Sequence, residues 1–552
     1  MIRSVHLIVF FMAWILIPVQ AFSQRERRDT SGTGSVDIIS NFKPTLRDLV
    51  KFQFSAQPPA PDSLRQPLSY RIPSQELSIS YQPGVLKPLA FLPDSNTGFR
   101  PSQYVKLGYG SLRNPYASVA LEWGKKNPLR FYGGHQSASG ARPFQKHSIS
   151  SGLLRWQLPD REMGEWSADL NFIREGYNKY GYDTSRAIPP ADSLRQVFLE
   201  YGLRVAYRRK KTSTVGFVVE PVLEGKLTGD RFDNRDVQAR LWVPIRYHFN
   251  DRISMQVDAM AHWGRISRSE GPALNRSVYS INPAIRFEQS RWSVHAGIRP
   301  AWDSAGVRIY PDVNLQWSHA SKPWFIRLNW SGELLRTGYR DLYSQNPWLW
   351  MPAQWRNQGV VDRSVQWQYQ RRAHWVYDVK VGYATQTNTF LFVNDTSASG
   401  DGKSFQVVYA DRIQNLYARA AVSYRQADRW LISGEAGWNQ YHSVLGADKA
   451  WGLLPFEWKL SGMHRFANKL RVQADLYSWF APLYLTKSGA SSRTDGAFDL
   501  NLGGQMPITP KISAWLQFNN LLNQTYSRWS QYPVYGFHFV GGVVFSLDKS
   551  IP

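Results

Sequence analysis

Strict alternation of apolar and polar residues is the feature that most constrains the fold of this chain. From Val237 to Phe249 every odd-numbered residue is apolar or aromatic, whereas the residues between them include Gln238 and Arg246. A period of two residues places the two sets on opposite faces of a β-strand. This segment is therefore predicted to be a strand with one apolar and one mostly polar face. After a short turn at 250–252, the same alternation resumes.

The alternation recurs along the chain, in the segments 166–172, 197–207, 215–223, 309–317, 416–424 and 512–518. A soluble β-sandwich can show some of this pattern. Strands this long, repeated over about 450 residues with regular turns, are instead typical of a barrel whose outer face meets lipid. The sequence thus predicts an all-β protein, a transmembrane antiparallel β-barrel of a Gram-negative outer membrane.

The composition agrees with this fold class. Aromatic residues make up 14% of the chain, yet the mean hydropathy is −0.41. A helical membrane protein is excluded by that hydropathy, whereas a wide barrel combines lipid-facing aromatic residues with a polar lumen. The chain has 0 cysteines, which excludes disulfides, thiolate metal sites and thiol catalysis.

The number of strands depends on one segment. When 405–425 is taken as a single long strand, the count is about 22, and even counts are the rule in single-chain bacterial barrels. Splitting that segment at 411–412 would give an odd count and would place the two ends of the barrel on opposite sides of the membrane. We therefore predict one protruding strand at 405–425.

The predicted connections fall into two classes. One set is short, and the alternate set is longer, as in barrels with short periplasmic turns and long extracellular loops. The short turns are 125–128, 210–213, 250–252, 289–291, 426–428, 467–469 and 508–511, and the long loops are 174–195, 228–236, 266–277, 338–366, 394–404 and 485–497. The longest loop carries Trp348, Trp350 and Trp355. Either these tryptophans contact a sugar or a protein, or the loop that carries them folds over its own barrel.

The end of the chain resembles the end of the barrel in TonB-dependent outer-membrane receptors. The residues that carry the resemblance are Asn520-Leu521-Leu522-Asn523, Tyr526 and the final alternating segment Gly536–Leu547. We expect that segment to close the barrel by pairing with a first strand near 104–111. The resemblance covers Gln103–Leu547 and implies energised uptake of a nutrient or metal chelate.

The chain departs from that family before its first strand, where a receptor carries a folded α/β plug. Residues 1–23 have the charged start, apolar run and small-x-small end of a signal peptide, with a retained membrane anchor as the alternative. Residues 24–100 carry many prolines and are predicted to form an extended periplasmic or lumenal arm rather than a recognisable plug. The predicted barrel occupies 101–547, followed by a short C-terminal tail at 548–552.

Charge suggests the candidate binding residues. The formal net charge is +24. These cations either solvate the turns and the lumen, or favour anionic partners, of which lipid and lipopolysaccharide phosphates are the nearest at an outer membrane. Nucleic acid is not expected. Arg204, Arg240, Arg246 and Arg286 are predicted to face the lumen, where they could bind anions. Alternatively, they pair with inward carboxylates such as Glu200, Glu224 and Glu288.

Catalytic and metal-binding patterns are weak. The sequence has no HExxH motif and no acidic calcium loop, and His248 and His262 are predicted to be solvated in the lumen. We expect no cofactor, no metal and no enzymatic activity. The preferred interpretation is a scaffold or component of an outer-membrane complex with a periplasmic or outer-membrane protein partner. A transport protein, either a passive pore or a receptor plugged by another chain, is the alternative, and a hydrolase of the barrel wall is the least favoured.

Overall fold

The computed structural model describes residues 103–124, 126–159, 164–182, 190–209, 216–371, 374–395, 402–427, 429–486 and 489–547. The predicted signal peptide, the arm 24–100 and the tail 548–552 lie outside these ranges and remain predictions.

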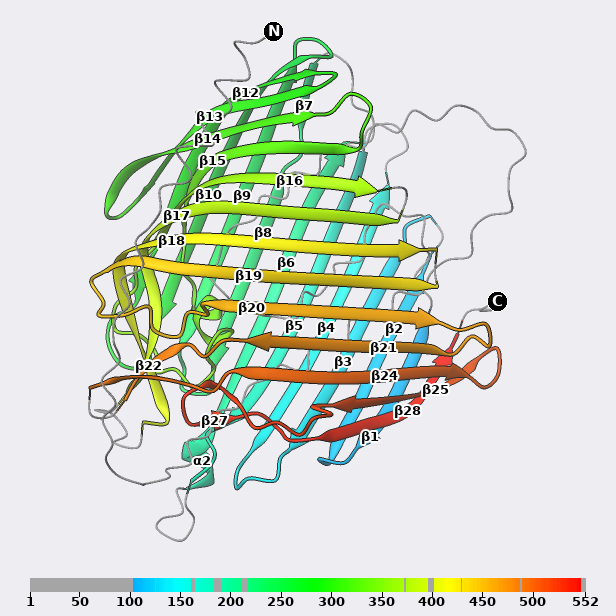
Figure 1. The fold of residues 1–552 in the computed structure, drawn as a ribbon. Helices are drawn as coiled ribbons and strands as arrows, with labels where there is room; N and C mark the ends of the chain where they lie inside the picture. Colours follow the sequence, from blue (N-terminus) through cyan, green and yellow to red (C-terminus); the bar gives the residue numbers. More distant parts are fainter. Residues whose placement is uncertain are drawn as a thin grey trace, which may run out of the picture. The chain divides into compact units, whose positions relative to one another are not determined.

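The described residues form a barrel of strands with a few short elements attached to one end (Figure 1). In chain order the strands are β1 (Tyr104–Gly110), β2 (Asn114–Trp123), β3 (Leu129–Ser139), β4 (Lys146–Pro159), β5 (Gly164–Asn178), β6 (Arg195–Arg209), β7 (Gly216–Val219), β8 (Val222–Asp230), β9 (Arg235–His248), β10 (Ile253–Ser267), β11 (Leu274–Asn275), β12 (Val278–Gln289), β13 (Trp292–Asp303), β14 (Gly306–Ser318), β15 (Trp324–Leu335), β16 (Gln358–Arg371), β17 (Trp375–Asp395), β18 (Ser404–Gln426), β19 (Trp430–Leu445), β20 (Phe456–Arg465), β21 (Arg471–Trp479), β22 (Leu483–Leu485), β23 (Ser491–Arg493), β24 (Ala497–Pro507), β25 (Ile512–Asn519), β26 (Ser527–Trp529), β27 (Tyr532–Pro533) and β28 (His538–Ser546).

The barrel closes where its last strand meets its first. β28 pairs antiparallel with β1, with Val105 opposite Phe545 and Tyr109 opposite Gly541. The result is a closed antiparallel barrel of 22 strands, in which β7 and β8 act as one strand interrupted at Pro221, a residue with no N–H to donate to the ladder. The predicted fold class, the even strand count and the closing role of the final segment are confirmed.

The two faces of the barrel wall have opposite chemistry. Val307 and Ile309 point outward and are 72% and 70% exposed, whereas Asn415 and Asp499 on the inner face are fully buried. This distribution is the reverse of that in a soluble protein, because the outer face is solvated by lipid.

An aromatic girdle marks one edge of the lipid-facing surface. Its rings lie where the strands meet the short turns, and many contact one another: Trp166 with Tyr207, Trp292 with Trp317, Trp317 with Trp324, Trp367 with Tyr369, and Trp375 with Tyr424. Tryptophan and tyrosine concentrate at membrane interfaces because their rings are amphipathic. Together with the closed barrel, the girdle identifies an outer-membrane protein.

The connections lie at two ends of the barrel, which we call the short-turn end and the long-loop end. In bacterial barrels the short turns face the periplasm and the long loops face outward. The labels α2 (Ala191–Leu194), β22 and β27 mark the long-loop end at the lower left of Figure 1. The longest loop is shorter than predicted, since β16 already begins at Gln358 and the loop ends at Asn357.

β17 and β18 extend well beyond the membrane. They contain 21 and 23 residues, whereas about 9–11 residues suffice to span a bilayer. The prediction of a single long strand at 405–425 is confirmed by β18. In the protruding part of β17, Phe390, Leu391, Phe392 and Val393 are all buried, so this segment is covered on both faces.

The helices in the described residues are α2 and α3 (Tyr339–Tyr343), and neither has the length or the apolar character needed to cross a bilayer.

Candidate functional site: the closed mouth of the barrel

The loops at the long-loop end fold inward and pack against one another. We call the described residues of the loops between β5 and β6, β15 and β16, β17 and β18, and β25 and β28, with the protruding ends of β17 and β18, the cap. The cap encloses a cluster of buried apolar side chains: Tyr177, Tyr180, Phe198, Ile266, Tyr339, Leu342, Tyr343, Trp348, Leu349, Trp355, Phe390, Phe392, Phe405, Tyr409, Trp529 and Tyr532. Such a core at a barrel mouth shows that these loops are folded rather than extended into solvent.

The short helix α3 inserts into this cluster. Its first turn is closed by the Gly338 N–H, which donates to Asp341 Oδ2 at 2.7 Å, while the Asp341 N–H donates to the Gly338 carbonyl at 3.1 Å. The spacing of Tyr339, Leu342 and Tyr343 places all three on one helix face, and each is 1% exposed or less. Tyr343 stacks on Phe198 of β6, with ring centroids 4.0 Å apart.

A buried ion pair holds the loop that carries α3. Arg336 and Asp236 are both fully buried, and Arg336 Nη1 lies 3.3 Å from Asp236 Oδ2. The Tyr339 N–H also donates to Asp236 Oδ2, at 2.9 Å. A buried carboxylate needs such charge-assisted donors, so the pair fixes the position at which the loop enters the mouth.

Contacts inside the cap cross the barrel from side to side. Lys179, after β5, donates to Ser404 Oγ of β18 at 2.6 Å, and Lys403 Nζ donates to the Tyr180 carbonyl at 2.8 Å. Eight barrel strands separate β6 from β17 on one side, and ten separate β18 from β5 on the other. Loops from nearly opposite walls therefore meet over the lumen.

The loop between β25 and β28 completes the cap. Tyr532 stacks on Trp348, with ring centroids 3.9 Å apart, and its hydroxyl donates to the Lys403 carbonyl. Tyr180 in turn donates its hydroxyl to the Pro533 carbonyl at 2.9 Å. This loop is thus joined to three other loops by one stack and two hydrogen bonds.

The structure separates the three tryptophans predicted as a contact surface. Trp348 and Trp355 are 3% and 8% exposed and belong to the buried cluster, whereas Trp350 is 43% exposed. Trp350 lies under Lys179, whose Nζ is 4.9 Å from the ring centroid. For Trp348 and Trp355 the geometry favours the interpretation in which the loop folds over its own barrel; contact through Trp350 stays a prediction.

The predicted lumenal arginines are brought next to carboxylates. Arg204 Nε lies 3.2 Å from Glu224 Oε1, and Arg240 Nη1 lies 3.8 Å from Glu224 Oε2. Arg286 Nε is 2.9 Å from Glu288 Oε1. The two pairs with Glu224 join neighbouring strands, as the alternative interpretation expected, whereas Arg286 and Glu288 lie on the same strand, β12. Binding of an anion by these arginines stays a prediction.

Arg246 and Glu200 differ from that pattern. Arg246 Nε is buried and has no hydrogen-bond partner in the described part of the chain. Glu200 pairs with Arg340 of α3, whose Nη1 is 2.8 Å from Glu200 Oε2. A carboxylate expected to neutralise a lumenal arginine is thereby used to attach the cap to the wall.

Two carboxylates of the inner wall were not predicted as centres of polar networks. Asp312 Oδ2 accepts from Asn282 Nδ2 at 2.7 Å and lies 3.1 Å from His295 Nε2. Asp362 accepts from the Tyr417 hydroxyl at 2.6 Å and pairs with Lys380 Nζ at 3.0 Å. Each network draws on several strands, so no local sequence signal could have revealed it.

The His295–Asp312 pair lacks the third member of a hydrolase triad. The Nδ1 atom of His295 is buried and has no hydrogen-bond partner among the described residues. No nucleophilic hydroxyl is therefore hydrogen-bonded to this nitrogen of the imidazole. Over the same part of the chain, no group of three histidine or acidic side chains is arranged to hold a metal ion.

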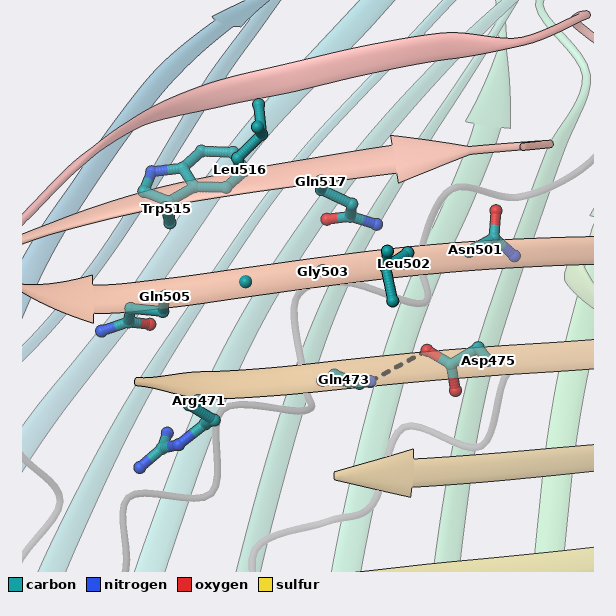
Figure 2. Close-up of a pocket in the computed structure, with 11 residues that line it drawn as sticks. Arg471, Gln473, Asp475, Asn501, Leu502, Gly503, Gln505, Trp515, Leu516 and Gln517 are labelled. Carbon is teal, nitrogen blue, oxygen red and sulfur yellow. Dashed lines mark hydrogen bonds between the residues drawn. The ribbon is translucent and has the colours of Figure 1, made fainter. Parts of the chain in front are cut away.

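A shallow pocket lies in the wall formed by β21, β24 and β25 (Figure 2). Gly503 leaves space between the side chains of Gln473, Gln505 and Gln517, with Trp515 along one edge. Gln473 Nε2 donates to Asp475 Oδ2 at 2.9 Å. The lining also includes the charged side chains of Arg471 and Asp475, and nothing in the pocket selects one ligand.

The sequence matches no protein-family model, and no curated protein is similar to it in sequence. Solved structures match its fold at low identity. The FrpB iron transporter from Neisseria meningitidis (F3-3 variant) has a TM-score of 0.61 at 10% identity, covering 81% of this chain and 82% of that chain. The copper transporter OprC has a TM-score of 0.57 at 12% identity, covering 81% and 80%.

A third similar structure is the siderophore receptor PirA from Acinetobacter baumannii, with a TM-score of 0.60 at 9% identity and coverage of 81% of each chain. These likenesses show the fold: the barrel is that of TonB-dependent outer-membrane receptors and transporters. The proteins with this fold named here are transporters and receptors rather than enzymes.

Proposed function

We propose that this chain is a non-enzymatic outer-membrane barrel, closed at its outer mouth, that serves as a component or scaffold of an outer-membrane complex. The observation that carries the proposal is the cap. Its loops meet over the lumen from nearly opposite walls through Lys179, Lys403 and the Trp348–Tyr532 stack.

The character of the cap supports a permanent closure. A mouth that opened with each transport event would expose Tyr339, Leu342 and Tyr343 to water, and each of these side chains contributes roughly 1.5–3 kcal/mol when fully buried. Separating Arg336 from Asp236 would also leave two charges without partners. The barrel is therefore better suited to presenting surfaces than to passing solutes.

The proposal also includes what lies outside the described residues. We infer that 24–100 is an extended arm on the periplasmic or lumenal side rather than a folded plug, and that it contacts a periplasmic or outer-membrane protein partner. Lipid and lipopolysaccharide are the surrounding partners. No cofactor, metal or nucleic acid takes part.

A transport role is the second candidate, and a specific observation favours it. The similar folds named above are an iron transporter, a copper transporter and a siderophore receptor. Under this alternative the cap is a gate that opens when a ligand binds, or the chain is a receptor plugged by another chain.

Conductance in a planar bilayer distinguishes the two roles. We expect the purified full-length protein to show little conductance, and the double variant Trp348→Ala/Tyr532→Ala to conduct because the stack across the mouth is lost. Trp430→Ala, in the aromatic girdle at the other end, is the matched control and should stay closed. A large pore in the unaltered protein would overturn the closed-mouth proposal.

Two further measurements complete the test. A variant lacking residues 24–100 should also stay closed, because the cap alone seals the mouth. Affinity purification from solubilised outer membranes should recover a stable protein partner. Ligand uptake that depends on the proton-motive force, with no partner recovered, would establish the transport role instead.

A further inference from the structure

Four arginines lie at the long-loop end of adjacent strands and face away from the lumen. Phe198 and Glu200 of β6 are buried inside, so the odd-numbered residues of β6, beginning with Arg195, face outward. By the same alternation Arg235 and Arg265 are on the outer face of β9 and β10, and Arg231 lies in the turn between β8 and β9. All four side chains are exposed.

Their height relative to the bilayer follows from a neighbouring tryptophan. Trp263 faces outward from β10 and is 42% exposed, as expected of a residue at the membrane interface. Arg265 is the next outward residue toward the long-loop end, roughly 7 Å further along the strand. This is the level of the headgroups of the outer leaflet.

The register brings two of the arginines together. Arg235 is opposite Ser267, and Arg265 is opposite Val237, so the two arginines are diagonal neighbours on one face. Such neighbours have Cα atoms roughly 7–8 Å apart, a distance that the branches of a single phosphate-bearing headgroup can bridge.

Arg231 is held in place by the backbone. Its Nη1 donates to the Asp192 carbonyl at 2.8 Å and to the Arg195 carbonyl at 3.2 Å, and its guanidinium lies 5.5 Å from the Phe232 ring centroid. These contacts hold the Arg231 guanidinium against the backbone of Asp192 and Arg195.

Among the described residues, the surface acids near this group are exposed. Asp233 lies 3.5 Å from Arg235, and the two side chains are 84% and 64% exposed, so water screens the pair. Asp192 and Glu270 are exposed on neighbouring loops. The half-buried Asp230 beside Arg231 accepts from the Phe232 N–H at 2.8 Å.

Another part of the rim is apolar. On the loop between β25 and β28, Leu521, Leu522 and Phe537 are 38%, 44% and 43% exposed. Exposed cations also occur elsewhere at the long-loop end, at Arg113, Lys449 and Arg493, but the four arginines differ from these in lying on adjacent strands and the turn between them.

We propose that Arg195, Arg231, Arg235 and Arg265 form a binding site for the phosphate groups of lipid A in the outer leaflet. Guanidinium groups bind phosphate through paired N–H donors, and these four meet the membrane where lipid phosphates are the abundant anions. The inference rests on the outer-membrane location and holds whether the barrel is a scaffold or a transporter.

Native mass spectrometry of the delipidated full-length protein in non-ionic detergent tests the site. We expect bis-phosphorylated lipid A to bind, and rising sodium chloride to weaken the complex. Arg231→Gln/Arg265→Gln should weaken binding roughly tenfold to thirtyfold, since each cation near a lipid surface contributes a few-fold. Arg291→Gln/Arg371→Gln, which removes the same charge at the short-turn end, should bind as the unaltered protein does.

Two further binding experiments distinguish recognition of the phosphate groups from recognition of the lipid. Dephosphorylated lipid A should bind more weakly than the bis-phosphorylated form, and inorganic phosphate at equal concentration should not displace the lipid. Equal binding of both lipid forms, or no effect of Arg231→Gln/Arg265→Gln, would refute the site. Displacement by inorganic phosphate at equal concentration would show a small-anion site and would overturn the assignment to lipid A.

Discussion

Asp236 illustrates how a charge is placed in the interior of the cap. Its carboxylate is fully buried and accepts from Arg336, from the Tyr339 N–H at 2.9 Å and from Gln238 Nε2 at 3.3 Å. Removing two ions from water costs several kcal/mol per ion, and only close donors in a low-dielectric site repay it. Such a pair fixes geometry more than it adds stability.

We predict that Arg336→Met will loosen the cap because Asp236 is left charged and buried. The free energy for opening the loop 336–357, measured by hydrogen exchange, should fall by about 3–5 kcal/mol. Arg356→Met is the matched control in the same loop. Arg356 pairs with Asp411 at 2.7 Å, but the two side chains are 41% and 63% exposed, so the loss should stay below about 1 kcal/mol. Equal effects of the two changes would contradict the role assigned to burial.

Asp341 should make the stability of the cap depend on pH. Burial raises the pKa of its carboxyl above the ordinary value of 3.8, and the hydrogen bond from Gly338 opposes this only in part. Because the folded cap binds the proton more tightly than the unfolded loop does, this contribution is present at low pH and is lost as pH rises through the raised pKa.

Asp341→Asn keeps an acceptor for the Gly338 N–H and removes the ionisation. We therefore expect this variant to be at least as stable as the unaltered protein at neutral pH, and the protection factors of the α3 amides to vary less between acidic and neutral pH. A pH profile identical to that of the unaltered protein would show that another group is responsible.

Most of the fold could be predicted from the residue pattern within individual strands. The alternation along β9 and β10 defined the inward and outward faces, and the parity argument identified β18 as one long strand. The residues Phe390 to Val393 of β17 break the alternation, since all four are apolar. A continuous apolar run is typical of a strand covered on both faces, and this run is a local signal of the cap.

Val313 and Asn314 allow a matched test of the two faces of one strand. They are neighbours near the middle of β14; Val313 faces lipid, and Asn314 faces the lumen. We predict that Val313→Lys will lower the free energy of unfolding by roughly 2–4 kcal/mol, as expected for a cation near the bilayer midplane, and that Asn314→Lys will have a smaller effect. Unfolding by denaturant in lipid bilayers measures both. Similar losses would mean that the assignment of the faces is wrong.

The candidate site was less predictable than the fold. The alternation along each strand showed which side chains point inward. It therefore indicated that lumenal arginines such as Arg204 could pair with carboxylates such as Glu224. The contacts of Lys179 with Ser404, and of Tyr180 with Pro533, did not follow, because each joins loops whose neighbourhood depends on the closed barrel. The tryptophans of the longest loop were compatible with a contact surface or with a loop folded over its own barrel, and burial shows that Trp348 and Trp355 belong to a core.

The molecule thus combines a lipid-facing wall with a folded layer across one end. β17 and β18 belong to both. One face of their protruding part contributes Phe390, Phe392 and Phe405 to the aromatic cluster. The other face packs Leu391, Val393 and Ala410 against Trp451 and the hairpin β22–β23. The two long strands are therefore the frame on which the cap is built.

We predict that the cap can be weakened without unfolding the barrel. Leu391 is fully buried, so Leu391→Ala should remove about 2–5 kcal/mol from the cap, through lost contacts and a cavity. Limited proteolysis should then cut the loops at the long-loop end, while the heat-modifiable migration of the barrel on gels stays unchanged. Leu460→Ala, at an outward and 43% exposed position, is the control and should not increase cutting. Loss of heat-modifiability in Leu391→Ala would show that cap and barrel unfold together.

The hydrogen bond from Tyr180 to Pro533 joins residues that are 353 positions apart in the chain. Contacts between such distant residues form slowly, since the intervening chain must first be ordered. Tyr180 and Pro533 come into reach only when the last strands are in place, so the aromatic cluster cannot be complete in a partly inserted chain. Sealing of the mouth is therefore expected to be among the final steps of biogenesis, and an intermediate arrested before the β28–β1 seam forms would present these aromatic side chains to the chaperones and insertion machinery of the cell.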